Sequence, residues 1–68
     1  MSGADPLQRL GEVLFEFHQV GGAVRVNAIH AETGTEITLV GAASAGVYAL
    51  KLAAMRKLAF VLGRHPAG

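Results

Sequence analysis

The sequence contains no cysteine and no tryptophan, and it carries few charges for its length. The absence of cysteine excludes disulfides and thiolate chemistry, and it suits a cytoplasmic protein. Charged residues make up 16% of the 68 residues and the net charge is +1, so no strong field directs the chain to nucleic acid or to an anionic membrane. Because so small a domain buries too little surface to be robust alone, oligomerisation is the stabilising device that remains.

An uninterrupted apolar run that could span a membrane is also missing. The most apolar stretch, Ala45 to Leu62, contains Lys51, Arg56 and Lys57. The first ten residues lack the apolar core and basic flank of a secretory signal. We therefore expect no membrane contact.

The length allows one domain, with short segments at either end. We expect residues 1–11 to be flexible or to form one helical turn, with Pro6 at its first position and Gly11 at its end. Residues 12–63 form the domain, and residues 64–68 are expected to be a flexible tail.

Three stretches alternate apolar and polar residues in the manner of strands: residues 12–20, 23–31 and 36–40. The Gly21-Gly22 pair between the first two is a signal for a two-residue hairpin turn. Thr33-Gly34 marks a second turn. The pattern predicts an antiparallel meander with the second strand in the middle.

The two hairpins agree on one apolar face of this sheet. A two-residue loop at Gly21-Gly22 sets Phe17 opposite Val26, and a two-residue loop at Thr33-Gly34 sets Ala28 opposite Leu39. A four-residue second loop gives the same parity, whereas a three-residue loop would turn the third strand over. The predicted apolar face consists of Val13, Phe15, Phe17, Val24, Val26, Ala28, Ile37 and Leu39.

The last element is predicted to be a helix, because Ala, Leu, Lys, Met and Arg dominate the stretch after the third strand. Gly41 is expected to end that strand, Ser44 to be the helix N-cap and Gly63 the residue just past its C-terminus. A helix of about 18 residues is roughly 27 Å long, enough to cover a three-stranded sheet. The predicted fold class is therefore α+β, a three-stranded antiparallel meander followed by one long C-terminal helix.

This helix is more apolar than packing on one sheet requires. One apolar stripe consists of Val47, Leu50, Ala54, Leu58 and Val61, and a second of Tyr48, Leu52, Met55, Ala59 and Leu62. The outer face of the sheet also mixes polar residues with Leu14, Val20, Ile29 and Val40. We therefore predict a homo-oligomer, most simply a two-fold dimer. The candidate self-association residues are Leu52, Met55, Ala59, Phe60 and Leu62. In the alternative, the N-terminal segment covers the spare stripe through Leu7 and Leu10.

The histidines, carboxylates and glycines do not form a known catalytic, metal-binding or phosphate-binding motif. His18 is predicted on the outer face opposite Arg25, and His65 lies in the tail. His30 is expected to be half-buried on the apolar side at the end of the sheet, with a backbone partner. No two histidines have a metal-binding spacing, although a site shared across a dimer stays open. The carboxylates Asp5, Glu12, Glu16, Glu32 and Glu36 avoid the core positions. No phosphate-binding glycine loop is present. We expect no catalytic, metal or cofactor-binding residue.

An RNA-binding module is the second functional hypothesis. The predicted order, a short helix, three antiparallel strands and a long helix, is that of double-stranded-RNA-binding domains. The candidate contacts are Arg25, Lys51, Arg56 and Lys57. However, the predicted helix start, residues 44–48, has no Lys or Arg, so nucleic-acid binding is the less favoured hypothesis.

Three stretches carry a resemblance to a family: Glu12-Val-Leu-Phe-Glu-Phe17, Thr33-Gly-Thr-Glu-Ile37 with Val40-Gly41, and Arg56-Lys-Leu-Ala-Phe-Val-Leu62. They resemble a short bacterial protein family of unknown function. The resemblance implies a free-standing small protein and supplies no site residues. Our interpretation is a non-enzymatic module that self-associates and binds another protein of unknown identity.

Overall fold

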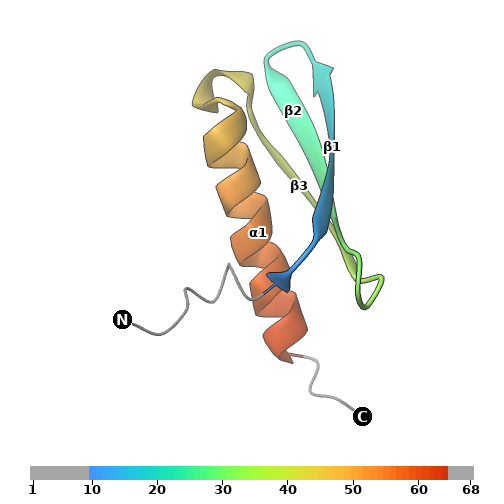
Figure 1. Ribbon diagram of the computed structural model, residues 1–68. Coiled ribbons are helices and arrows are strands. Elements are labelled where there is room, and N and C mark those ends of the chain that lie inside the picture. The colour runs from blue at the N-terminus through green and yellow to red at the C-terminus, as the bar shows by residue number, and fades with distance from the viewer. Residues whose placement is uncertain (1–9, 65–68) are drawn as a thin grey trace.

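The computed structural model describes residues 10–64, with side chains to residue 63 (Figure 1). Its elements are β1 (Val13–Val20), β2 (Ala23–His30), β3 (Glu36–Ala42), the 3-10 helix η2 (Ala43–Ala45) and α1 (Val47–Arg64). The predicted α+β class and the order of three strands and a helix are confirmed. The expectations for residues 1–9 and 65–68, including most of the predicted N-terminal turn, lie outside the described residues.

The three strands form one antiparallel sheet in the order β1-β2-β3. Val20 pairs with Ala23 across the two-residue turn, and Phe17 lies opposite Val26 as predicted. Gly21 has a φ of 59°, the left-handed region that a side chain disfavours. The glycine pair therefore sets the register of the first hairpin.

The second hairpin has a longer loop than the two residues we predicted first. Ala28 lies opposite Ile37, not Leu39. The loop comprises residues 31–34, closed by hydrogen bonds from His30 N to Thr35 O (2.7 Å) and from Gly34 N to His30 O (2.7 Å). Gly34 supplies the left-handed residue, with a φ of 76°. The parity is that of the four-residue alternative, so the same residues of β3 face the helix.

Gly41 does not end β3, as the sequence had suggested, but pairs with Val24 inside it. A Cβ atom at Gly41 would collide with Cδ2 of Leu50 on α1. The glycine therefore allows the first turns of α1 to approach the sheet closely.

We expect Gly41→Ala to destabilise the fold by about 1–3 kcal/mol, because buried Leu50 must leave its place to admit the new methyl group. Urea denaturation followed by circular dichroism measures the change. Gly22→Ala is the matched control, because nothing lies within 4 Å of a Cβ atom there and Gly22 has no positive φ. Equal midpoints for the two variants would contradict this role of Gly41.

The limits of α1 differ from the predicted ones at both ends. The helix begins at Val47, and Gly46, with a φ of 91°, acts as its N-cap because its carbonyl accepts the bond from Leu50 N (3.1 Å). Ser44 lies inside η2, so its predicted N-cap role is wrong. Gly63 lies inside α1 and has no left-handed conformation, so it is not the residue beyond the helix.

The hydrophobic core lies between α1 and the sheet, and α1 packs against β2 and β3 rather than β1 (Figure 1). The helix follows β3 after a short connection, so it starts at that side of the sheet. An α-helix is about 10 Å across and strands are spaced about 4.8 Å apart, so one helix covers two strands well and a third poorly. The buried apolar residues are Leu10, Val24, Val26, Ala28, Ile37, Leu50, Ala54 and Leu58.

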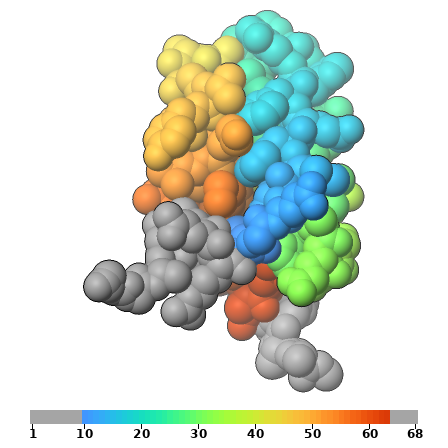
Figure 2. Space-filling model, in the orientation of Figure 1, coloured from blue at the N-terminus to red at the C-terminus, as the bar shows by residue number. Residues whose placement is uncertain are grey.

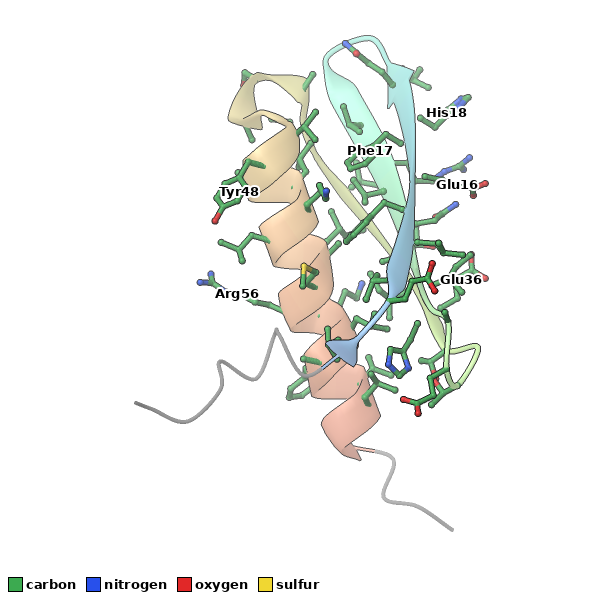
Figure 3. The ribbon with its side chains drawn as sticks, viewed as in Figure 1. Glu16, Phe17, His18, Glu36, Tyr48 and Arg56 are labelled. Carbon is green, nitrogen blue, oxygen red and sulfur yellow. The ribbon has the colours of Figure 1, made fainter. Side chains whose placement is uncertain are left out.

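Most of the predicted apolar face is confirmed. Its β2 members and Ile37 are buried, and Val13, Phe15 and Leu39 are partly buried against the core. Phe17 is the exception, with 39% of its surface exposed. Its side chain points toward the helix side of the sheet but lies beyond the strands that α1 covers (Figure 3).

Candidate self-association surface

The outer edge of β1 presents backbone hydrogen-bonding groups that no described strand pairs with. His30 N bonds to Thr35 O and Ala43 N bonds to Gly22 O, so even-numbered residues of β2 face β3. Because backbone groups alternate between neighbouring strands, odd-numbered residues of β2 face β1, where their partners are even-numbered. The backbone groups of Val13, Phe15, Phe17 and Gln19 therefore point outward, and we call them the β1 edge.

Two aromatic side chains of the β1 edge lie on the inner face of the sheet. The rings of Phe15 and Phe17 stack with centroids 6.1 Å apart and an interplanar angle of 24°. Nζ of Lys51, on α1, lies 5.1 Å from the centroid of the Phe15 ring, a cation–π geometry. Phe15 is thus partly covered from the helix, whereas Phe17 stays open to solvent.

The opposite edge of the sheet, formed by β3, is in contact with a charged side chain. Lys57 Nζ donates a hydrogen bond to Thr38 O at 2.7 Å. Thr38 is an even-numbered residue of β3, and its carbonyl points away from β2 by the same alternation. A lysine side chain that reaches from a helix to an edge carbonyl occupies that acceptor and opposes the addition of another strand. The two edges therefore differ, and β1 is the accessible one.

The outer face of the sheet, turned away from α1, carries the predicted mixture of polar and apolar residues. Asn27 joins all three strands: its Nδ2 donates to Glu16 Oε1 (3.5 Å), and Thr38 Oγ1 donates to its Oδ1 (2.8 Å). Leu14, Val20 and Val40 lie on the same face and are at least half exposed. Glu16, His18 and Glu36 point away from the helix (Figure 3).

The candidate self-association residues on α1 are more buried than free docking residues would be. Met55, Ala59 and Leu62 pack partly buried against the core, and Leu52 is partly buried. Phe60 is largely exposed, although it makes an interaction of its own. Leu10 is buried in the core, as the alternative of a covering N-terminal segment expected, and Leu7 lies outside the described residues. The open apolar surface therefore lies as much on the sheet as on the helix.

The four basic residues proposed for RNA binding do not share a face. Arg25 lies on the outer face opposite His18, while Lys51 covers Phe15 on the inner side. Lys57 bonds to the β3 edge, and Arg56 points away from the sheet (Figure 3). A phosphate backbone requires clustered cations, and this arrangement gives no such patch among the described residues.

His30 has the predicted backbone partner and is more buried than expected, with 5% of its surface exposed. Its Nε2 lies 2.6 Å from Leu10 O, and its Nδ1 lies 2.7 Å from Thr33 Oγ1. His18 lies on the other face, and His65 is outside the described residues. Glu12, Glu16, Glu32 and Glu36 are exposed, whereas Asp5 is not described.

Within residues 10–63, no three acidic or histidine side chains gather as metal ligands, and no pocket is enclosed. No helix among the described residues has both the length and the apolar character needed to cross a bilayer.

In a comparison with protein families, the chain matches a domain of unknown function, DUF6898, over residues 10–65. The chain belongs to the DUF6898 family. The match covers β1 to α1 entirely, so the domain defined by the fold and by the family is the same. No curated protein and no solved structure matches the DUF6898 chain. The predicted resemblance to a family of unknown function is thereby confirmed.

Sequence reasoning missed the β1 edge, because it assigned Phe17 to the core. The signal was available: one helix covers about two strand spacings, and a helix that follows the third strand leaves the first strand uncovered. The space-filling view shows the β1 residues at the surface beside the helix (Figure 2).

Proposed function

We infer that this DUF6898 domain is a non-enzymatic module that works by self-association. The observation that carries this inference is the exposure of seven large apolar side chains, between 39% and 78%, within residues 10–63. They are Leu14, Phe17, Val20, Val40, Val47, Tyr48 and Phe60. Single exposed apolar residues are ordinary, but several on a very small monomer are typical of a contact surface.

The polar residues support a binding role over a catalytic one. Both ring nitrogens of His30 are engaged in bonds that hold the chain together. Glu16 and Asn27 bond to each other across strands. A catalytic site needs a nucleophile or base beside groups that converge on a substrate, and these side chains serve the sheet instead.

Sedimentation velocity of the full chain, across a micromolar concentration range, tests the proposal. We expect a concentration-dependent shift from monomer to dimer, accompanied by a thermal midpoint that rises with concentration, because association stabilises the folded state. A folded chain that sediments as a monomer at every concentration, with a constant midpoint, would overturn it.

A further inference from the structure

Resting on the proposed self-association, we propose that a second copy of this chain docks on the β1 edge. The two β1 strands pair antiparallel about a two-fold axis at Phe17. The two three-stranded sheets then form one continuous six-stranded sheet, with both α1 helices on the same face. The backbone of the β1 edge and the order of side chains along β1 both lead to this arrangement.

The backbone allows only some registers for such a pair. Only odd-numbered residues of β1 point their N–H and C=O groups outward, so odd-numbered residues must pair with odd-numbered residues of the second copy. In a two-fold pair, the axis then passes through one central residue. Four residues near the middle of β1 are candidates for this position: Phe15, Glu16, Phe17 and His18.

An axis at Phe17 makes the outer face of the strand complementary to itself. Glu16 then faces His18 of the second copy, an acid opposite a base. Leu14 faces Val20 of the second copy, so two exposed apolar side chains cover each other. An imidazole can donate a hydrogen bond to a carboxylate, and hydrogen-bonded and apolar pairs directly across strands are stabilising. Each contact occurs twice, once on either side of the axis.

The other registers bring poorly matched side chains together on the outer face. An axis at Glu16 sets that carboxylate opposite its own copy. An axis at His18 places Glu16 opposite Val20, and an axis at Phe15 places Glu16 opposite Leu14. Like charges directly opposite each other are destabilising, and an apolar side chain gives a carboxylate no hydrogen bond or charge partner. The side chains of β1 therefore select the Phe17 register.

The inner face supports the same choice. Phe17, which α1 leaves exposed, meets Phe17 of the second copy, and paired aromatic side chains are favourable across strands. Phe15 faces Gln19 of the second copy, so the two Phe15 rings are offset by four residues, about 13 Å along the strand. The Lys51 ammonium over each ring is then separated from its copy by more than a Debye length of about 8 Å.

Because the chain has no cysteine, single cysteines report the register directly. In the proposed pair, residue 16 directly faces residue 18 of the second copy, at about 4.5 Å between Cα atoms, which a disulfide spans. Residue 16 lies about 8 Å from residue 16 of the second copy, beyond disulfide reach. The same distance separates the two copies of residue 18. Both side chains are exposed, so Glu16→Cys and His18→Cys leave the core intact.

The experiment mixes Glu16→Cys with His18→Cys chains under mild oxidation and follows disulfide formation on a non-reducing gel. We expect the mixture to cross-link on the order of a hundredfold faster than either variant alone, the ratio of a millimolar effective concentration to a protein concentration of about 10 µM. Glu36→Cys mixed with His18→Cys is the matched control. It is also exposed on the outer face but lies on β3, and we expect it to react at the slow rate.

The outcomes separate this inference from the proposed function. Fast linkage of Glu16→Cys to itself would place the axis at residue 16 and overturn the Phe17 register. If no pair links quickly while the unmodified chain sediments as a dimer, self-association stands and the β1 edge is not its surface. If the unmodified chain sediments as a monomer throughout, both fail.

Discussion

Replacing Leu58 by Ala is expected to lower the free energy of unfolding by about 2–5 kcal/mol. Leu58 is fully buried between α1 and the sheet, one of the two largest side chains with less than 2% of their surface exposed. Its truncation removes buried apolar area and leaves a cavity that the small core fills only partly. A domain of 68 residues has a total stability of roughly 3–10 kcal/mol, so this one change consumes much of it.

Thermal unfolding followed by circular dichroism measures this loss. At about 4–8 °C per kcal/mol for a domain of this size, a loss of about 2 kcal/mol or more should lower the midpoint by at least about 8 °C. Val47→Ala is the matched control, because Val47 lies on the same helix but is largely exposed. We expect its effect to stay within about 0.5 kcal/mol. A similar loss for both variants would mean that α1 is not held by the contact of its buried stripe with β2 and β3.

The fold was predictable because the pattern of a strand repeats every two residues. The two turns and the alternation of apolar residues fixed the parity of all three strands, and an error in the length of the second loop shifted β3 by two residues without turning it over. The stripe through Leu50, Ala54 and Leu58 was also correctly read as helical, and it is the stripe that packs on the sheet.

Besides Ser44 and Phe17, the positions that the sequence-based prediction misplaced are glycines with different physical roles. Gly41 and Gly63 were both taken as ends of elements, yet Gly41 lies inside a strand because Leu50 needs the space. Gly46 fell inside the predicted helix, because Ser44 was taken as the N-cap, yet its φ of 91° sets the start of α1. A glycine in the sequence can mark a left-handed backbone conformation, a close approach of another element to the backbone, or neither. Tertiary contacts decide which of these applies.

The candidate surface was predicted less well, because the predicted apolar face of three strands was not compared with the two strands that one helix can cover. The excess of apolar side chains was visible from composition, and seven large ones are exposed among the residues whose side chains the structure describes. Their location depends on the side of the sheet at which α1 starts. That side follows from the short η2 connection after β3, which leaves Phe17 outside the covered area.

A second large loss of stability is expected on replacing His30. This β2 residue bonds both to Leu10, before β1, and to Thr33, in the loop between β2 and β3. Because the Leu10 carbonyl only accepts hydrogen bonds, Nε2 must carry a hydrogen, and it donates a hydrogen bond to Leu10 O at 2.6 Å. Nδ1 reaches Thr33 Oγ1 at 2.7 Å, and Thr33 Oγ1 lies 2.8 Å from Thr35 Oγ1. His30→Leu fills the buried position with an apolar side chain. It leaves the Leu10 carbonyl without its hydrogen-bond donor.

We expect His30→Leu to destabilise the domain by roughly 2–4 kcal/mol, because a buried polar group without a partner costs about 1–3 kcal/mol and the Thr33 contact is lost as well. Chemical denaturation measures the total. Thr33→Val is the matched control, since it removes the contact with Nδ1 and the exposed contacts of Thr33 Oγ1 with Thr35 but keeps the bond from Nε2 to the Leu10 carbonyl. Its cost should be nearer 1 kcal/mol.

Limited trypsin digestion then shows which part of the chain loses stability in His30→Leu. Trypsin cleaves after arginine, and Arg9 directly precedes Leu10 in the sequence. If His30 holds Leu10 in the core, His30→Leu should speed cleavage after Arg9 at least about fivefold under conditions where the folded domain persists. Cleavage after Lys51, in the middle of α1, should change much less, because it requires the helix itself to open. Equal acceleration at both bonds would show that His30 supports the whole core and not the attachment of Leu10, since a local tether affects only the segment it holds.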